Sequence, residues 1–527
     1  MLPAIWHRYI FLFGLIGLAA GMLFGTVPTS IPQIILAANW LLEKNFEWKW
    51  KQLKSNKIFW VLVSLYILHI LGMFYTQNLG RGLDDLRNKL PLLVLPLILF
   101  STKPLDKKEF KLLFNFFFIS VLISSICCFL VYKGYTKKTI VDVRQASVFM
   151  SHIRFSLFIA FSIIGLVYYV VKTKQLIIKL VNIIIVAWLM FFIYKLEMAT
   201  GIVCLVLSCI ILSVVFSIRT LPKTASITLI VFIVIVFTYS LNMIITSLKM
   251  YDKSKNHWSN VLLEKTKNGR YYTQDTNYNL AENGTLILVN VSDIELSQQW
   301  PLRSRLSYLG KDRKGNNLRY TLLRYLASKK LTKDSVGLAS LSLDDIKNVE
   351  NGITNYKYHI NSGLSAKWRE LVWEYKKYKR KENPSGHTFT MRLEFWKTAS
   401  YIIYEHPYFG VGTGDIQDSF NEMYIKTNSK LDPIWRLRCH NQYLAIGVAY
   451  GFVGLLLFAF YLLYPAIVLR KELHYLYWSF YLIALLSFIT EDTLETQSGV
   501  TFFIFFQTLF LWLASFREEP NTLIPKQ

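Results

Sequence analysis

Basic residues and one histidine crowd together near position 440 of this 527-residue chain. Arg436, Arg438 and His440 alternate along the stretch, and Asn441 and Gln442 follow directly. Guanidinium groups bind phosphate oxygens through charge-assisted hydrogen bonds. A histidine side chain exchanges a proton near neutral pH, so it suits general acid–base chemistry. These residue types predict a site that binds an anionic group and moves a proton beside it.

A second group of candidates begins at Met391. Apolar and basic side chains recur there at helical spacing, at Arg392, Phe395, Trp396, Ala399 and Ile402. The predicted amphipathic helix ends at His406-Pro407, and the glycine-rich run FGVGTGD follows. Alternate glycines favour a tight structural turn. A phosphate-binding loop is the alternative, but no Walker lysine accompanies the run.

Two further polar segments supply candidates. One holds Arg144, His152 and Arg154, which predict a cationic lining for an anionic ligand; a solvated loop is the alternative. The other, at residues 491–495, holds acids without Lys or Arg, namely Glu491, Asp492 and Glu495. We expect these acids either to orient His440 and pair with the arginines, or to form a plain solvated loop.

The elements that position these residues are apolar. Apolar residues make up 53% of the chain and aromatic residues 16%, and the mean hydropathy is +0.32, which excludes a disordered chain. Twelve apolar runs are predicted to cross a bilayer, and they lie near 9–25, 31–43, 58–75, 90–102, 112–132, 155–172, 175–195, 200–217, 226–248, 442–468, 475–490 and 498–515. The sequence therefore predicts an all-α polytopic membrane protein with about 12 transmembrane helices.

The distribution of positive charge predicts the orientation. With both termini in the cytoplasm, the cytoplasmic segments hold about 19 Lys and Arg residues and the opposite short loops about nine. The predicted domains are then a transmembrane bundle over 1–248, a large outside loop over 249–441 and a transmembrane bundle over 442–527. The net charge of +25 is explained by this topology and not by nucleic-acid binding.

The outside loop is predicted to be an α+β segment. Polar and apolar residues alternate from Tyr271 to Ser292 about an Asn283-Gly284 turn, which predicts a β-hairpin. Ser342 begins a capping-box pattern for a short helix. A basic amphipathic helix is expected over 366–381, with its apolar side packed on the core of the loop or lying on a membrane surface.

Taken together, these motifs resemble those of a known family. The runs R-x3-W from Arg392, HPYFGVGTGD and HNQYL from His440, followed by a glycine-containing span, are similar to the O-antigen ligase and O-antigen polymerase superfamily. The resemblance covers about 391–465, and His152-Ile-Arg154-Phe is a further partial match. It implies a bacterial inner-membrane glycosyltransferase with many spans and one large periplasmic loop.

The resemblance also implies a reaction. Enzymes of this superfamily pass an undecaprenyl-diphosphate-linked glycan to a hydroxyl of the lipid A core, of another glycan or of a protein. By this resemblance His440 is the catalytic base and Arg392 a catalytic partner. Arg154, Arg438, Arg144, His152 and Arg436 are then expected to bind the diphosphate. We expect an inverting reaction without a cofactor or metal, because guanidinium groups can neutralise the leaving group.

Ligase, polymerase and protein O-oligosaccharyltransferase all remain open from the sequence. A polysaccharide or lipid transporter is the alternative from another class, but no internal repeat of the kind found in transporters is visible. The expected partners are the lipid-linked glycan donor, a glycolipid or glycan acceptor, and the lipid bilayer.

Overall fold

The computed structural model describes residues 3–136, 140, 143–253, 262–278, 280–356 and 364–516. The chain forms two compact units. Unit 1 consists of residues 1–226 and 383–527, and unit 2 consists of residues 227–382. Residues 383–441, which follow the sequence of unit 2, therefore pack with the apolar helices of unit 1.

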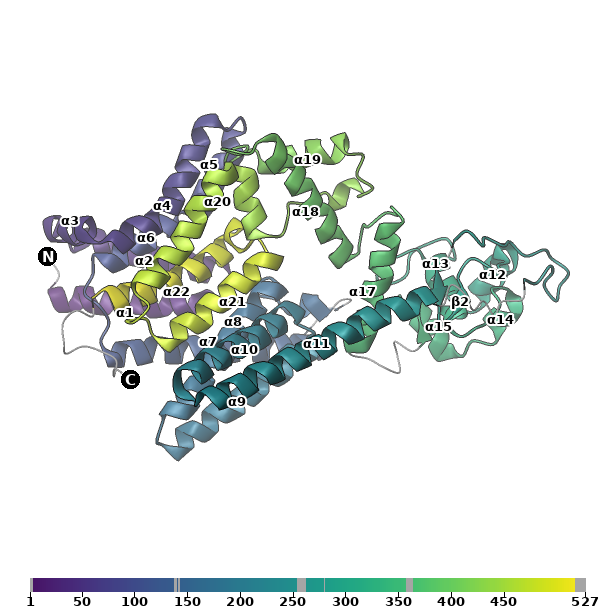
Figure 1. Cartoon of the computed structure of the whole chain (residues 1–527), viewed down its shortest axis with the longest axis horizontal. Helices are drawn as coiled ribbons and strands as arrows, with labels where there is room; N and C mark the ends of the chain where they lie inside the picture. Colours follow the sequence, from purple (N-terminus) through teal and green to yellow (C-terminus); the bar gives the residue numbers. More distant parts are fainter. Residues whose placement is uncertain are drawn as a thin grey trace. The chain divides into compact units, whose positions relative to one another are not determined.

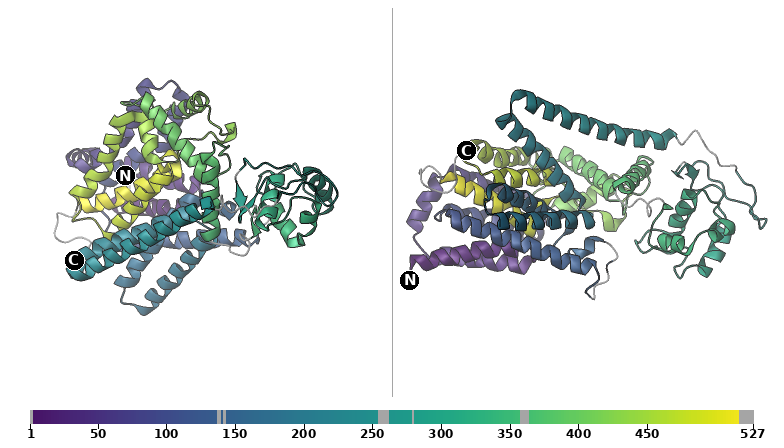
Figure 2. Two further views of the ribbon diagram at one scale, coloured as in Figure 1. Left: turned by 45° about the vertical axis from the view of Figure 1, so that its right-hand side comes forward. Right: turned by 90° about the horizontal axis from the view of Figure 1, so that it is seen from below.

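Unit 1 is built from helices that run side by side (Figures 1 and 2). Its helices before unit 2 are α1 (Ala4–Gly21), α2 (Thr26–Leu42), α3 (Phe46–Ser55), α4 (Lys57–Gly72), α5 (Leu79–Lys89), α6 (Pro91–Phe100), α7 (Lys107–Tyr132), α8 (His152–Lys172), α9 (Leu176–Lys195) and α10 (Ala199–Thr220). Its helices after unit 2 are α18 (Thr388–Glu405), α19 (Ile416–Lys426), α20 (Gln442–Val468), α21 (Tyr475–Thr490) and α22 (Gln497–Ser515). The 3-10 helices of unit 1 are η1 (Met73–Tyr75), η2 (Val143–Ala146), η5 (Pro433–Trp435) and η6 (Thr493–Glu495).

Each of the predicted apolar runs forms a helix, and the chain is an all-α polytopic membrane protein. Within the described residues, 8 helices are long and apolar enough to cross a membrane: α1, α4, α7, α8, α9, α10, α20 and α22. The remaining predicted runs form α2, α6, α21 and α11 (Lys223–Lys253). α6 has only 10 residues, because Pro91 starts it and the apolar run ends at Phe100.

The core of unit 1 is rich in phenylalanine. Rings from α7, α8, α21 and α22 contact one another, among them Phe117, Phe161, Phe480 and Phe506. α22 lies at the centre, since 83% of its apolar window is buried, against 17% for α9. The exposed apolar side chains of α9, such as Ile177 and Ile184, suit contact with lipid.

Helix α20 is broken near its middle. Gly451 has φ 61° and ψ −152°, and a Cβ there would lie 2.4 Å from the backbone of Tyr408. The N–H groups of Phe452 and Val453 turn away from their own helix and donate to the carbonyls of Pro407 and Tyr408, at 2.7 and 3.2 Å. Only glycine combines this left-handed conformation with so close a backbone contact.

Unit 2 contains short helices gathered around one hairpin (Figures 1 and 2). Its described elements after α11 are β1 (Ala281–Glu282), β2 (Thr285–Leu286), α12 (Asp293–Gln299), η4 (Trp300–Leu302), α13 (Leu318–Ser328), α14 (Ser335–Ala339), α15 (Leu343–Glu350) and α17 (Leu364–Lys379). Leu322, Leu326 and Trp300 are buried at its core. The predicted capping box of Ser342 with Asp345 is confirmed.

The predicted hairpin is confirmed but is shorter than expected. β1 and β2 pair antiparallel, and Asn283 and Gly284 both have positive φ, as a two-residue hairpin turn requires. Farther out, the pairing continues in the isolated bridge from Thr273 to Val291 and in the bond from the N–H of Asp275 to the carbonyl of Leu288 at 2.8 Å. The Asp275 carboxylate accepts bonds from the N–H groups at 277 and 278, and this local turn interrupts the strand.

The apolar side of α17 packs into unit 2. Val372 and Trp373 are buried, and Trp373 belongs to the core of this unit. The interpretation that this basic helix packs on the core of the loop is therefore confirmed for residues 372–373. The side chain of Trp368, also expected on this face, lies outside the described residues.

Candidate active site

The polar residues singled out by the sequence meet where four segments of unit 1 converge. Arg392 comes from α18, Arg438 and His440 from the segment entering α20, and the acids from the link between α21 and α22. The start of α8 adds Arg154, whose charge interacts with those of Glu491 and Asp492. Residues far apart in the chain thus form one cluster.

His440 is held between a strained backbone and two carboxylates. Its φ is 45°, a left-handed value that is uncommon for residues other than glycine. Next to it, Asn441 caps α20 by accepting the N–H of Leu444 at 3.0 Å, and its amide donates to the carbonyl of Ile489 at 2.9 Å. The backbone strain is therefore held in place by the start of the helix.

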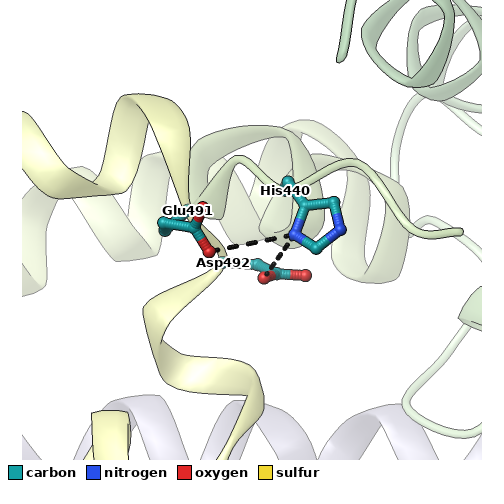
Figure 3. Close-up of side chains that lie close together, drawn as sticks. All are labelled: His440, Glu491 and Asp492. Carbon is teal, nitrogen blue, oxygen red and sulfur yellow. Dashed lines mark ion pairs between the residues drawn. The ribbon is translucent and has the colours of Figure 1, made fainter. Parts of the chain in front are cut away.

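The histidine ring has two different sides (Figure 3). Its Nδ1 atom lies 3.5 Å from Asp492 Oδ1 and 3.9 Å from Glu491 Oε2, and the other ring nitrogen points away from both carboxylates. The ring packs against Phe395, with centroids 5.7 Å apart. Two carboxylates favour a proton on Nδ1, which leaves Nε2 as the basic nitrogen. The side chain is 34% exposed, so a substrate can reach it.

Arg392 forms the second part of the cluster. Its Nη2 atom donates to Glu491 Oε1 at 2.7 Å. Its Nε atom is buried and has no hydrogen-bond partner among the described residues. Buried donors are almost always satisfied, so this guanidinium N–H is available to a water molecule or to a further group.

The three acids of residues 491–495 are buried and paired, and do not form a solvated loop. Burial raises the pKa of Glu491, and the charges of Arg392 and His440 oppose this rise without cancelling it. Burial alone would also raise the pKa of Asp492, but His440 and Arg438 lower it below its usual value. Lys89 and Arg438 likewise outweigh burial and lower the pKa of Glu495 to about 2. Asp492 and Glu495 are therefore ionised at neutral pH.

Sequence reasoning missed a buried lysine behind this cluster. Lys89, at the end of α5, contacts both oxygens of Glu495 at 3.1 Å and Asp85 Oδ2 at 2.9 Å. Glu495 also accepts from Arg438 at 3.2 Å and from Gln442 at 3.3 Å. One feature of the sequence could have indicated its role. Lys89 lies two residues before Pro91, which starts an apolar helix, and the loop that contains it is predicted to lie outside the cytoplasm.

The other predicted residues lie in different surroundings. Arg436 donates from Nε to the carbonyl of Leu431 at 3.2 Å. His152 starts α8, and its Nδ1 atom lies 3.1 Å from the Ser147 hydroxyl. Arg144 is exposed on η2. Their expected contacts with the diphosphate remain predictions.

The glycine-rich run is a structural turn. Its backbone N–H groups from 411 to 414 donate in order to Val448 O, Ala449 O, Gly72 O and Thr76 Oγ1, at 3.0, 2.9, 3.4 and 3.1 Å. Two of these acceptors are the carbonyls left without a helical partner by the break at Gly451. Because these donors are already used, the run is not available as a phosphate-binding loop.

The cluster also has the geometry of a possible cation site. His440, Glu491 and Asp492 each place one ligand atom within 4.8 Å of the others, and such a group could hold a metal ion. The spacing along the sequence did not indicate this arrangement, because the ligands come from two segments about 50 residues apart. Arg392 occupies one oxygen of Glu491, and Arg438 and Arg154 act on the same acids, so positive charge is already supplied.

Comparison with known proteins agrees with this site. Residues 336–459 match the family model described as O-antigen ligase. No curated protein matches the chain. The predicted resemblance to this family is confirmed, and the matched segment contains Arg392, Arg438 and His440. The chain is therefore a multi-pass membrane protein in which residues 336–459 are similar to the O-antigen ligase family, and this similarity supports a glycosyltransferase of the ligase or polymerase kind.

Proposed function

We propose that this protein transfers an undecaprenyl-diphosphate-linked O-antigen glycan to an acceptor hydroxyl of the lipid A core. The observation that carries the proposal is the cluster of Arg392, Arg438 and Arg154 around the acids beside His440. Arg392, Arg438 and His440 lie in the segment that matches the O-antigen ligase model. The Lys and Arg distribution supports cytoplasmic termini in the bacterial inner membrane, with the cluster at the periplasmic face.

The proton step uses the two sides of the histidine ring. Asp492 and Glu491 hold a proton on Nδ1, and Nε2 then accepts the proton of the acceptor hydroxyl. The hydroxyl oxygen attacks the anomeric carbon as its O–H bond breaks. His440 becomes an imidazolium, which the two carboxylates stabilise by charge.

The bond that breaks joins the anomeric carbon to the diphosphate. Undecaprenyl diphosphate leaves with the bonding electrons, and its growing negative charge is stabilised by Arg392, Arg438 and Arg154. Preorganised cations at a membrane face stabilise this charge more strongly than they would in water. Direct displacement inverts the anomeric carbon, and the arginines remove the need for a metal ion.

Complementation of a ligase-deficient bacterium tests this proposal. We expect His440→Ala and Arg392→Ala each to abolish transfer, because loss of a general base or of a stabilising cation costs roughly 10²- to 10⁴-fold in rate. Surface polysaccharide and lipid-linked polymer are both measured by gel and blot. Loss of the attached polymer with accumulation of the lipid-linked polymer is the expected result for a ligase.

Arg81→Ala is the matched control, since Arg81 forms an exposed ion pair with Asp418 in the same unit. It is expected to leave the polysaccharide unchanged. Loss of polymer length with single units still attached would identify a polymerase instead. Normal polysaccharide in both active-site variants would remove His440 and Arg392 from the mechanism.

A further inference from the structure

Lys89 is among the most buried charged residues of unit 1. Its side chain is 2% exposed. The hydrogen bonds described above join its ammonium group to two acids, Asp85 and Glu495, and both oxygens of Glu495 take part. The three contacts lie between 2.9 and 3.1 Å. A buried ammonium with this geometry is fixed in place, because moving it would leave charges without partners in a medium of low dielectric.

Glu495 is shared between Lys89 on one side and Arg438 on the other. Its side chain is 3% exposed, whereas that of Arg438 is 33% exposed. Gln442 fixes the same link, because it donates to Glu495 and accepts the N–H of Leu494 at 2.7 Å. One end of this network is therefore sealed inside the protein and the other is open to a ligand.

Three acids act on the charge of Arg438, namely Glu495, Asp492 and Asp85. Lys89 contacts two of them, Glu495 and Asp85, and its positive charge offsets part of theirs. Without Lys89, Arg438 would be the counter-ion of both acids. Its charge would then be used within the protein and would not be available to an incoming anion.

We propose that Lys89 is a positioning residue for donor binding, which neutralises Glu495 and so keeps the charge of Arg438 available for the diphosphate. This inference rests on the proposed function, because it concerns how the same site binds its anionic donor. A lysine that served only the fold would contribute stability and would not affect donor affinity.

The test compares purified full-length variants in detergent or nanodiscs. We expect Lys89→Met to raise the KM for the lipid-diphosphate donor about tenfold, the order of magnitude of one unit charge acting nearby in a partly buried site, with a smaller change in kcat. Lys89→Arg should keep a KM near that of the wild type. The double variant Lys89→Met/Glu495→Gln removes the lysine together with the charge that it neutralises, so its KM should return toward the wild-type value.

Lys49 provides the matched control. It is equally buried, and its Nζ atom contacts Glu43 Oε2 at 2.9 Å and the carbonyl of Trp40 at 2.6 Å, away from the His440 cluster. Lys49→Met should lower the melting temperature without changing the KM for the donor. An unchanged donor KM in Lys89→Met, with a loss of melting temperature like that of Lys49→Met, would overturn the inference. Failure of the double variant to regain affinity would do the same.

Binding of undecaprenyl diphosphate to the same variants separates the two proposals. If the wild type binds this lipid but shows no transfer, and Lys89→Met binds it more weakly, the inference stands and the proposed function fails. If wild type and Lys89→Met bind it equally, the inference fails alone. If the wild type neither binds the lipid nor shows transfer, both are overturned.

Discussion

Each unit contains a buried network of ion pairs, and the two networks differ in whether their hydrogen-bond donors all have partners. In unit 2, Arg324 donates from Nε and Nη2 to Glu282 Oε1 at 2.8 and 2.6 Å. Its guanidinium lies 3.6 Å from the centre of the Trp373 ring, and Glu282 Oε2 accepts from Asn355 at 2.7 Å. This arrangement engages both carboxylate oxygens and the face of the guanidinium.

The network of unit 1 also pairs arginine with glutamate, but some of its donors have no partner among the described residues. Arg392 has a buried Nε atom with no partner among the described residues, and His440 turns one ring nitrogen away from its acids. Arg438 and His440 are each about one-third exposed. A network that satisfies its members stabilises a fold, whereas one that keeps donors unused at an open edge is suited to bind a further group.

The largest expected effect that separates the two networks is on the stability of unit 2. Arg324→Ala leaves Glu282 buried without its cation, and breaking a buried pair in this way costs about 3–5 kcal/mol. We expect faster hydrogen exchange in α13 of the purified full-length chain, measured by mass spectrometry. Removal of the Arg324 side chain should lower the stability of unit 2, and chains that remain folded should still carry out transfer.

Arg313→Ala is the control for that comparison. Arg313 and Glu350 form a pair at 3.4 Å in which the arginine is 61% exposed, and such surface pairs contribute about 0–1 kcal/mol. Its hydrogen exchange should match that of the wild type. Loss of transfer by Arg324→Ala with α13 still protected would place a functional site in unit 2 and contradict the distinction.

A smaller effect is expected on the pH dependence of transfer. Because burial raises the pKa of Glu491, this residue takes up a proton at a pH above the ordinary value of 4.5 as the solution is acidified. Protonation removes the charge that holds Arg392 and Nδ1 of His440. The rate of transfer should therefore fall as the pH is lowered past the raised pKa of Glu491, and it should recover when the pH is raised and the carboxylate is ionised again.

Glu491→Gln isolates this contribution. The variant should be slower at neutral pH by about tenfold or less, because one charge-assisted bond is weakened and not lost. Its kcat/KM should lack the part of the acid-side decline that belongs to Glu491. Asp418→Asn, which alters an exposed pair, should keep the wild-type profile. An acid-side decline identical in Glu491→Gln and wild type would assign it to another group.

The elements that depend on local patterns were predicted well. The apolar runs form helices because backbone groups in a bilayer must be satisfied within each segment. The Asn283-Gly284 turn and the Ser342 capping box follow from short-range rules and are confirmed. The break at Gly451 was not predicted, because it depends on carbonyls of residues 407 and 408 arriving from another part of the chain.

The candidate site was predictable only in part. His440 stood out because it is a polar residue at the entrance of an apolar segment, and Arg392 stood out through the R-x3-W motif of a predicted amphipathic helix. Lys89 pairs with a residue 406 positions away, so its role could not be inferred from spacing. Burial alone does not distinguish Lys89, because Lys49 is equally buried. Lys89 differs in that its acidic partner Glu495 is shared with Arg438.

The smallest expected effect is the response to metal removal. His440, Glu491 and Asp492 could together bind a divalent ion, yet a cation there would compete with Arg392 for Glu491 and would need His440 Nδ1 without its proton. If the arginines supply the positive charge, dialysis against EDTA should leave the rate of transfer unchanged, and added Mg²⁺ or Mn²⁺ should not raise it. Asp492→Asn sharpens the test, since it weakens metal binding but keeps a hydrogen-bond acceptor for Nδ1. If activity is lost in EDTA and recovered on adding one divalent ion, His440, Glu491 and Asp492 form a metal centre. The two networks would then differ because one binds an ion, and not because one has arginine donors without a partner.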